Sequence, residues 1–279
     1  MSKKRKLVSL VVCIVLAMSL TLVGCNGGSG GGGGSSNGDA AEMWNVTPGV
    51  LTVGSDCDYP PFVEMQGDQA VGFEPEMLQA IADELGLELE YLPPQNFDTI
   101  LASVASGTKM DIGVSSFTIN DERKQLVDFS FPYFDSNQAA VALVDSSYTS
   151  AMDFDGLTVG AQSGTTGADW VRENLTSSGT VLKEFNQASE LMASLTAGDI
   201  QGAFFDEPAA AQYVATSYTN AHIVEVIPTG EQYGIAVSQD NPGLLQAIND
   251  AMITIKKNGV FDKIFLKYFP DLTPPSLGT

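Results

Sequence analysis

Apolar positions change between two spacings along the chain, beginning near residue 46. A β-rich segment at 50–54 is followed by a turn cluster with two prolines, and apolar residues then recur at helical spacing over 75–85. An alternating segment at 87–91, a helical segment that ends at Gly107 and a strand at 111–115 follow. This β-α-β-α-β order predicts a largely parallel sheet covered by helices.

A second set of strands and helices begins after residues 136–140. It predicts strands at 157–160, 181–185, 201–205 and 223–227, and helices at 169–175, 190–196 and 208–216. Residues 101–107 and 192–198 share one pattern, a helix that stops at a glycine before a strand, which suggests two lobes of one design. The chain ends with a strand at 233–237 and helices at 241–257 and 261–269. Two such lobes, with polar groups at the carboxyl ends of their strands, imply a cleft between them.

The first 24 residues have the pattern of an export signal. Residues 3–6 are basic, residues 7–23 are almost all apolar, and Gly24-Cys25 resembles the bacterial lipoprotein processing site. We therefore expect a signal peptide at 1–24 and lipidation of Cys25; the alternative is an uncleaved helix that anchors the chain in a membrane. Residues 25–46 are rich in Gly and Ser and predict a flexible tether between the acyl chains and the folded part.

Composition narrows the possible partners and chemistry. With 279 residues, 44% of them hydrophobic, the chain can bury a core, and its net charge of -21 argues against nucleic acid as a partner. Cleavage before Cys25 would remove four of 13 basic residues and none of 34 acidic ones, which lowers the charge to -25. One histidine and three cysteines leave no material for a disulfide framework, a zinc site or a catalytic triad. We expect a monomer without metal or cofactor, in which Cys57 is the remaining thiol.

Arg123 is the first candidate for a functional residue. The mature chain keeps two arginines, Arg123 and Arg172, and Arg123 follows a hydroxyl-rich strand end, Ser115-Ser116-Phe117-Thr118. A planar guanidinium beside hydroxyl groups suits a bidentate carboxylate. The alternative is a surface arginine paired with a neighbouring acid, namely Asp121, Glu122 or Asp128.

Two further candidates lie where a strand meets a helix. Gly164-Thr165-Thr166 could offer unpaired N–H groups to an anion, and a threonine-capped turn explains the same pattern equally well. Asp206 follows the strand at 201–205 and could receive an ammonium group, or it could cap the helix that begins near Pro208.

An acidic and aromatic loop follows the first strand. Asp56, Tyr59 and Phe62 lie in this loop, and Phe97 precedes the second helix. Aromatic side chains at this edge could hold an aliphatic or cationic group, whereas local packing around the two prolines is the competing explanation. The chain has no Gly-x-Ser-x-Gly, His-Glu-x-x-His or Cys-x-x-Cys motif, so nothing in it points to enzymatic activity.

Several short segments occur in a specific order from about residue 50 to the terminal helix. They are Gly54-Ser55-Asp56, Tyr59-Pro60-Pro61-Phe62, Gly72-Phe73-Glu74, Thr118 with Glu122-Arg123, Val127-Asp128-Phe129-Ser130 with Pro132-Tyr133, Val159-Gly160 with Gly164-Thr165-Thr166, Asp206 and Tyr233-Gly234-Ile235-Ala236. As an ordered set they resemble the polar amino-acid family of ABC-transporter substrate-binding proteins. Two segments depart from the family pattern: Asn120-Asp121 stands where Thr-Pro is usual, and Glu74-Pro75-Glu76 stands where Asp-x-Asp is usual.

The resemblance implies an α/β fold of the type II periplasmic-binding class, in which two crossing strands join two lobes. Each lobe would be a mostly parallel sheet flanked by helices. The first lobe would comprise residues 47–137 and 234–279, and the second lobe residues 138–233.

The resemblance also implies roles for individual residues in closing around a free amino acid. Arg123 would clamp the α-carboxylate with help from Thr118, Thr165 and Thr166, and Asp206 and Ser116 would receive the α-ammonium. The side-chain pocket would be formed by Tyr59, Phe62, Phe97, Asp56 and Gln162. Asp56 beside aromatic walls slightly favours a cationic or polar ligand.

The partners implied are a free amino acid, an ABC permease and, through the lipid anchor, the outer face of the bacterial cell membrane. A receptor-coupled sensor and an adhesive lipoprotein without a small ligand are weaker alternatives. An exported dehydratase of the same fold, acting on arogenate or prephenate, is the enzymatic alternative.

Overall fold

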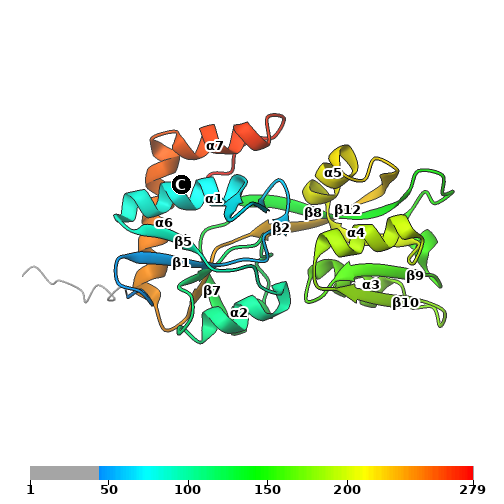
Figure 1. Cartoon of the computed structure of the whole chain (residues 1–279), viewed down its shortest axis with the longest axis horizontal. Coiled ribbons are helices and arrows are strands. Elements are labelled where there is room, and N and C mark those ends of the chain that lie inside the picture. The colour runs from blue at the N-terminus through cyan, green and yellow to red at the C-terminus, as the bar shows by residue number, and fades with distance from the viewer. Residues whose placement is uncertain (1–43, 279) are drawn as a thin grey trace, which may run out of the picture. The chain divides into compact units, whose positions relative to one another are not determined.

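A computed structural model describes residues 44–278, which contain two five-stranded sheets and their helices (Figure 1). The predicted signal peptide, Cys25 and most of the predicted tether lie outside the described residues.

The first sheet has the strand order β5-β1-β6-β13-β7. Its strands are β1 (Val50–Gly54), β5 (Glu88–Tyr91), β6 (Ile112–Gly113), β7 (Val127–Phe129) and β13 (Ala236–Ser238). β1 is parallel to β5 and β6, whereas β13 is antiparallel to β6 and β7. The helices of this part are α1 (Phe73–Leu85), α2 (Phe97–Ala105), α6 (Pro242–Lys257) and α7 (Val260–Tyr268). In Figure 1, α1 and α7 lie on one side of β1 and α2 lies on the other.

The second sheet has the order β10-β9-β11-β8-β12. Its strands are β8 (Phe134–Leu143), β9 (Thr158–Gln162), β10 (Val181–Phe185), β11 (Gly202–Asp206) and β12 (Ala221–Tyr233). β9 is parallel to β10 and β11, and β8 is antiparallel to β11 and β12. Its helices are α3 (Thr166–Asn174), α4 (Ala188–Ala197) and α5 (Glu207–Thr216), with the short 3-10 helix η2 at Ala151–Phe154.

The helix signals of the sequence act in the structure as expected. α1 buries the stripe that was predicted from spacing, including Met77, Leu78 and Ile81, and ends at Gly86, whose φ of 67° is the left-handed geometry that glycine favours. α6 begins after Asn241, whose side chain accepts a hydrogen bond from the N–H of Leu244.

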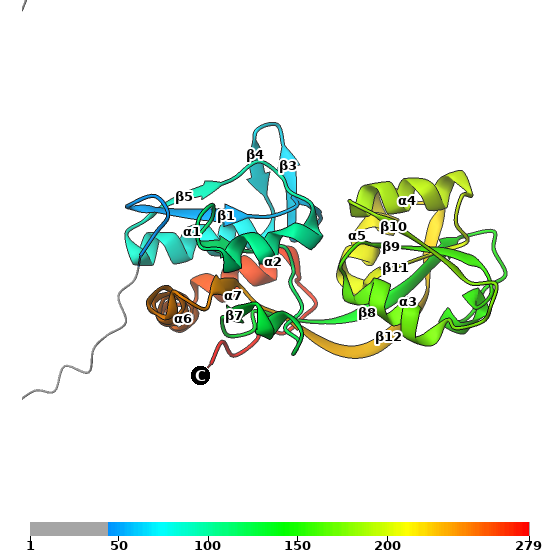
Figure 2. The ribbon, with the colours of Figure 1, turned by 90° about the horizontal axis from the view of Figure 1, so that it is seen from below.

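Two long strands, β8 and β12, connect the sheets. They pair antiparallel from Phe134 opposite Tyr233 to Leu143 opposite Ala221. Figures 1 and 2 show both strands extending from the second sheet toward the first. The lobe boundaries predicted from the family resemblance fall inside β8 and at the end of β12.

Three strand predictions differ from the structure. The strand expected at 223–227 extends over all of β12, because the chain stays paired with β8 through two shifts of register, one between Ile223 and Glu225 and one between Ile227 and Glu231. The strand expected at 233–237 divides into the end of β12 and β13. The strand expected at 111–115 shortens to β6, because the chain turns at Ser116, whose φ is 52°.

Other strands were not predicted at all. A small antiparallel sheet follows β1 and comprises β2 (Asp58–Tyr59), β3 (Val63–Gln66) and β4 (Gln69–Val71). β7 was also missed. These strands are two to four residues long and carry polar side chains, so they lack the alternation on which the prediction depends.

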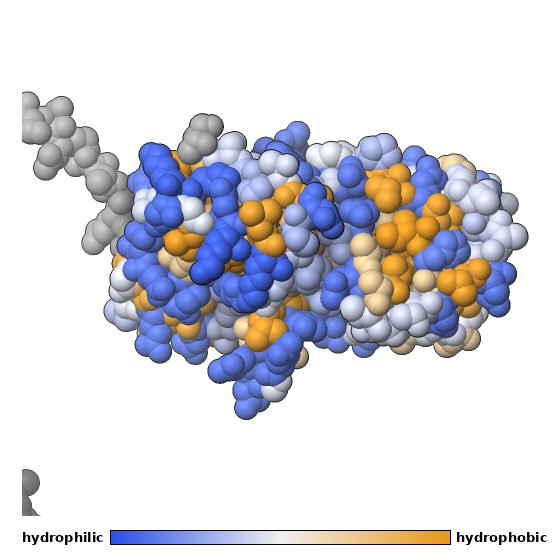
Figure 3. Space-filling view, turned by 90° about the horizontal axis from the view of Figure 1, so that it is seen from above, coloured by the Kyte–Doolittle hydropathy of each residue, from blue (hydrophilic) through white to orange (hydrophobic). Residues whose placement is uncertain are grey.

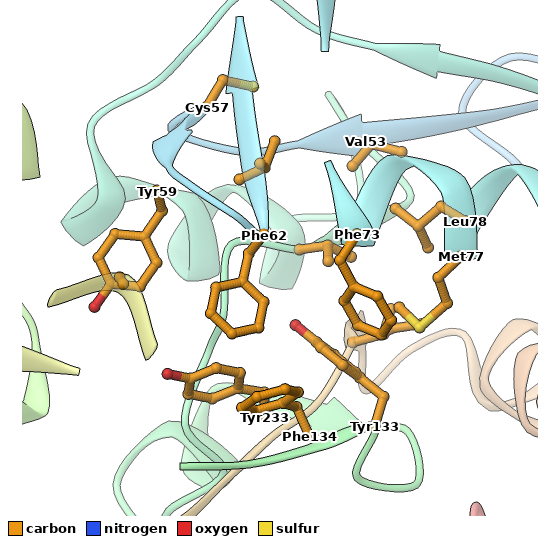
Figure 4. Packing of buried hydrophobic residues seen from close by; sticks show 14 of the residues in the cluster. Val53, Cys57, Tyr59, Phe62, Phe73, Met77, Leu78, Tyr133, Phe134 and Tyr233 are labelled. Carbon is orange, nitrogen blue, oxygen red and sulfur yellow. The ribbon is translucent and has the colours of Figure 1, made fainter. Parts of the chain in front are cut away.

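An aromatic core lies under β2 and β3 in the first part of the chain. The ring of Phe62 contacts Phe73, Phe134, Tyr233 and Phe269, at centroid distances of 4.9 to 6.3 Å. Figure 4 shows the rings of Phe62, Phe73, Phe134 and Tyr233 gathered together, whereas the ring of Tyr59 reaches away from them. On the face seen in Figure 3, hydrophilic residues surround separate hydrophobic groups.

Candidate ligand-binding site

One cavity brings together ten of the eleven ligand-binding residues predicted from the sequence. It contains about 320 Å³ of space free of protein atoms, part of which is open to solvent. Its lining consists of Asp56, Tyr59, Phe97, Ser115, Ser116, Thr118, Arg123, Gln162, Thr165, Thr166, Phe205 and Asp206. These residues come from the last positions of β9 and β11 and from the segments that follow β1, β5, β6 and β9, so strand ends of both sheets contribute to the lining.

Arg123 is buried and does not lie on the surface. It begins the short 3-10 helix η1 (Arg123–Gln125), and Asn120 Oδ1 accepts a hydrogen bond from its backbone N–H at 2.8 Å. Its guanidinium donates to the carbonyl oxygens of Thr118 and Gly164 at 2.8 and 3.1 Å. Burial lowers the pKa of this side chain from its ordinary value. No ion pair within residues 44–278 involves Arg123, so the surface-pair alternative is wrong.

Two aromatic rings flank the guanidinium of Arg123. Its Cζ lies 5.5 Å from the ring centre of Phe97 and 5.6 Å from that of Phe117, and these two rings stack on each other at 4.6 Å. A cation over aromatic faces gains electrostatic attraction without a carboxylate partner. The arrangement holds the charge in place and leaves part of its donor fork free for a ligand.

Asp206 supplies an acid at the opposite side of the cavity. It ends β11 and precedes α5, but its side chain makes no capping bond, so the helix-cap interpretation holds for its position only. Its carboxylate accepts hydrogen bonds from the side chains of Tyr233 and Gln138. Burial, assisted by the nearby charge of Glu231, raises the pKa of Asp206 to about 7.

The turn after β9 is threonine-capped, as one of the two interpretations of its sequence expected. Thr165 caps α3: its hydroxyl accepts from the N–H of Ala168 at 3.2 Å and donates to the carbonyl oxygen of Gln162 at 2.7 Å. Gly164 has a φ of 73°, and a Cβ there would lie 2.9 Å from Cβ of Asp98. Glycine therefore permits the close approach that brings its carbonyl oxygen to Arg123.

Asp56 is almost completely buried and is already paired. Ser115 Oγ donates to one of its oxygens at 2.6 Å, and Gln162 Nε2 donates to the other at 2.9 Å. Burial raises the pKa of Asp56 above its ordinary value. The bond between Asp56 and Gln162 joins segments that follow β1 and β9, and therefore crosses from one sheet to the other.

The prediction that Phe62 lines the ligand-binding site is wrong. It was expected to line the side-chain pocket, but it is fully buried in the aromatic core and is absent from the cavity lining. The backbone of residues 59–62 turns, with Phe62 N–H bonded to the carbonyl oxygen of Tyr59. The two aromatic residues therefore point in different directions, although their rings stack at 6.3 Å.

Three polar residues near the cavity were missed as site residues. Glu74 is fully buried and accepts from the N–H and hydroxyl of Ser116, at 2.7 and 3.0 Å, and from the hydroxyl of Tyr133. Burial raises the pKa of Glu74 to about 7. Gln138 and Glu231 lie on β8 and β12 and contact Asp206, Thr118 and Thr166. Glu74 stood in a segment shared with the family, but no sequence signal separates Gln138 or Glu231 from ordinary strand residues.

Two negative findings apply to residues 44–278. No His, Cys, Asp or Glu residues gather there in a group of three that could hold a metal ion. In the same residues, no helix combines the length and the apolar character needed to cross a membrane.

Residues 51–271 match the family of bacterial extracellular solute-binding proteins, family 3, and the chain belongs to this family. The L-cystine-binding protein TcyJ of Escherichia coli (strain K12) is 32% identical to it over 225 residues, which cover 79% of this chain and 83% of TcyJ.

Solved structures of related proteins share the fold. An ancestral arginine-binding protein bound to arginine gives a TM-score of 0.75 at 37% identity and covers 79% of this chain and 98% of its own. The ancestral amino acid-binding protein AncCDT-1, described as a precursor of cyclohexadienyl dehydratase, gives a TM-score of 0.72 at 32% identity. The match covers 79% of this chain and 96% of AncCDT-1. These similarities confirm the predicted family and the two-lobed α/β fold of the type II periplasmic-binding class.

Proposed function

We propose that this chain captures a free amino acid and delivers it to an ABC importer. One observation carries the proposal: the buried cation Arg123 and the buried acid Asp206 line the same cavity without pairing with each other. A zwitterion presents a carboxylate and an ammonium group a short distance apart and can satisfy both. Relatives named for cystine and arginine binding support this choice of ligand class.

Closure of the two lobes around the ligand is the mechanism that we propose. Several bonds join the two sides: Arg123 to the carbonyl of Gly164, Gln162 to Asp56, and the N–H of Ser189 to Asp58 at 2.8 Å. A ligand that bonds to Arg123 and to Asp206 adds its binding energy to the closed arrangement, and the equilibrium shifts toward closure.

The far wall of the cavity favours a cationic or polar side chain. Asp56 and Gln162 supply polar groups there and Phe97 supplies an apolar face. Asp56 accepts hydrogen bonds from Ser115 and Gln162, so a guanidinium or ammonium group must compete with Gln162 for it. The resulting preference is for ligands that donate several hydrogen bonds.

The family to which the chain belongs is extracellular, and we propose that the chain is a monomer attached to the membrane by acylated Cys25. Mass spectrometry of the mature protein tests this attachment directly. A diacylglycerol-modified N-terminal Cys25 is expected, and the replacement Cys25→Ser should release the protein into the medium. An N-terminus upstream of Cys25 would contradict it.

A thermal-shift screen with the twenty amino acids tests the binding function. Binding of a ligand at one hundred times its Kd should stabilise the protein by about 2.7 kcal/mol, and the unfolding midpoint should rise for a small set of ligands only. Incubation with arogenate and prephenate tests the enzymatic alternative, and no turnover is expected. A protein that responds to no amino acid, or that turns over either compound, would contradict the proposal.

A further inference from the structure

Glu231 is a buried acid behind the cavity lining that the proposed mechanism does not use. It lies on β12 and is 9% exposed. Its Oε2 accepts from the hydroxyl groups of Thr118 at 2.5 Å and Thr166 at 2.8 Å. Its Oε1 accepts from the amide of Gln138 at 2.9 Å and the hydroxyl of Thr229 at 3.0 Å. Thr118 follows β6 and Thr166 begins α3, so one carboxylate bonds to groups from both sides of the cavity.

These bonds fix the direction in which two hydroxyl groups donate. A threonine hydroxyl has one proton and two lone pairs, and an ionised carboxylate only accepts. Thr118 and Thr166 therefore give their protons to Glu231. What they offer to a ligand in the cavity that they line is lone pairs, of which one on Thr166 already accepts from Gln138 Nε2 at 3.2 Å.

Other hydroxyl groups of the lining are committed in the same way. Ser115 donates to Asp56, Ser116 donates to Glu74, and Thr165 donates to the carbonyl of Gln162. Among the six lining residues that carry a hydroxyl, five thus donate to the protein itself. The cavity is rich in acceptors, and its strong donor is Arg123.

We infer that Glu231 is a positioning residue, which orients the Thr118 and Thr166 hydroxyls as acceptors for the α-ammonium group of the ligand. The inference rests on the proposed function and changes one part of it. Thr118, expected from the family resemblance to help bind the carboxylate, joins Asp206 in receiving the ammonium instead. The carboxylate is left to Arg123 and to the N–H groups at the first turn of α3, which have no partner within the helix. Gln138 links the two acids, because its Nε2 donates to both Glu231 and Asp206.

The substitution Glu231→Gln should reverse this direction. Gln138 and Thr229 both donate toward Oε1, so the carbonyl oxygen of the new amide would take that place and its NH₂ would face Thr118 and Thr166. The NH₂ then donates to the two hydroxyls and releases their protons toward the cavity. The hydroxyl protons of Thr118 and Thr166 would then face the ammonium group. Because an ammonium group also only donates, neither hydrogen bond could form.

Calorimetry with L-arginine and its α-hydroxy analogue, 2-hydroxy-5-guanidinopentanoate, tests the inference. The analogue keeps the carboxylate and side chain but replaces the ammonium with a hydroxyl, which can also accept. Glu231→Gln should lower the affinity for L-arginine by about 10- to 100-fold and change the affinity for the analogue by less than about 3-fold. A purely structural role would weaken both ligands equally and leave their ratio unchanged. If the thermal-shift screen selects another amino acid, that amino acid and its α-hydroxy analogue replace the pair.

Glu225→Gln is the matched control, because Glu225 lies on the same strand and accepts from the N–H of Ala151, away from the cavity lining. It should leave both affinities unchanged. An unchanged ratio in Glu231→Gln overturns the inference while the proposed function stands. A wild-type protein that binds no amino acid overturns both.

Neutron diffraction from crystals of the deuterated wild-type protein gives a second test that does not depend on the variant folding. Deuterium on Thr118 Oγ1 and Thr166 Oγ1 should point to Glu231. Deuterium that points into the cavity would overturn the inference.

Discussion

The two sheets have the same frame but supply different groups to the cavity: the first lobe supplies the cation Arg123 and the acid Asp56, and the second supplies the acid Asp206. In the first sheet β1 lies between β5 and β6, and in the second sheet β9 lies between β10 and β11, with parallel pairing in both cases. Two further strands, joined by antiparallel pairing, complete each row. β9 and β11 lead within a few residues into helices, which place Thr165 and Asp206 at helix starts. Arg123 lies in the longer segment that follows β6, where its guanidinium is beside the stacked rings of Phe97 and Phe117.

This difference shows that the frame and the chemistry are specified separately. A strand that passes directly into a helix places a short acid or hydroxyl at a defined point. A guanidinium needs more surroundings: carbonyl acceptors, an aromatic wall and exclusion of water. The longer segment after β6 supplies Phe117 and the carbonyl of Thr118, while α2 supplies Phe97 and the turn after β9 supplies the carbonyl of Gly164.

Among the substitutions that test this difference, removal of the cation should lower ligand affinity the most. Arg123→Ala would leave the ligand carboxylate unpaired in a closed site, and we expect affinity to fall by at least about 100-fold, from a loss of about 3 to 5 kcal/mol. Calorimetry with the amino acid chosen by the screen measures it. Arg172→Ala is the control, because Arg172 is exposed and pairs with Asp169 and Glu184. Equal affinity in the two variants would mean that Arg123 does not bind the ligand.

Neutralising the acid should have the next largest effect. Asp206→Asn keeps the size of the side chain but loses the charge that receives the ammonium, and we expect affinity to fall by about 10- to 100-fold. Glu207→Gln, one position later at the start of α5, should change affinity by less than about 2-fold. If Asp206→Asn lowered affinity less than Glu207→Gln, Asp206 would not be the acid that receives the ammonium group.

The raised pKa values of Asp206 and Glu74, both about 7, predict opposite pH trends for stability and binding. Unfolded carboxyl groups lose their protons near pH 4 to 4.5. Between there and about pH 7 the folded state holds more protons, so the free energy of unfolding of the ligand-free protein should fall as pH rises. Ligand affinity should rise over the same range up to about pH 8, because an ammonium ligand needs ionised Asp206.

Urea unfolding and calorimetry at pH 5, 6, 7 and 8 measure the two trends. Asp206→Asn should flatten the binding trend and reduce the stability trend, with the contribution of Glu74 remaining. A ligand affinity that falls as pH rises would contradict the assignment of Asp206.

The smallest expected effect separates the two aromatic residues that the sequence grouped together. Phe62→Leu should lower the free energy of unfolding by about 1 to 2 kcal/mol through loss of core packing, and should leave affinity nearly unchanged. Phe97→Leu should lower affinity by a few-fold, because it removes a wall of the cavity beside Arg123. Urea unfolding and calorimetry on both variants decide the point. Equal profiles would mean that the two rings share one role.

Much of the fold could be predicted because it depends on local patterns. The spacing of Met77, Leu78 and Ile81 and the stop at Gly86 act within a few residues of themselves. Short polar strands such as β2 and β4 were missed, since neither alternation nor apolar length marks them. The length of β12 was missed because its partner β8 lies about 80 to 100 residues away in the chain, and pairing across that distance leaves no local signal.

By itself, the sequence determined the class of fold, the family and most of the residues that line the cavity, since each follows a strand end in a recognisable segment. The tertiary structure alone decided that Phe62 belongs to the core and that Arg123 is buried without an acid. It also decided that Glu74, Gln138 and Glu231 hold the lining in place. The physical reason is that side-chain direction, burial and the sense of a hydrogen bond depend on neighbours brought together by folding, and these neighbours are distant in the sequence.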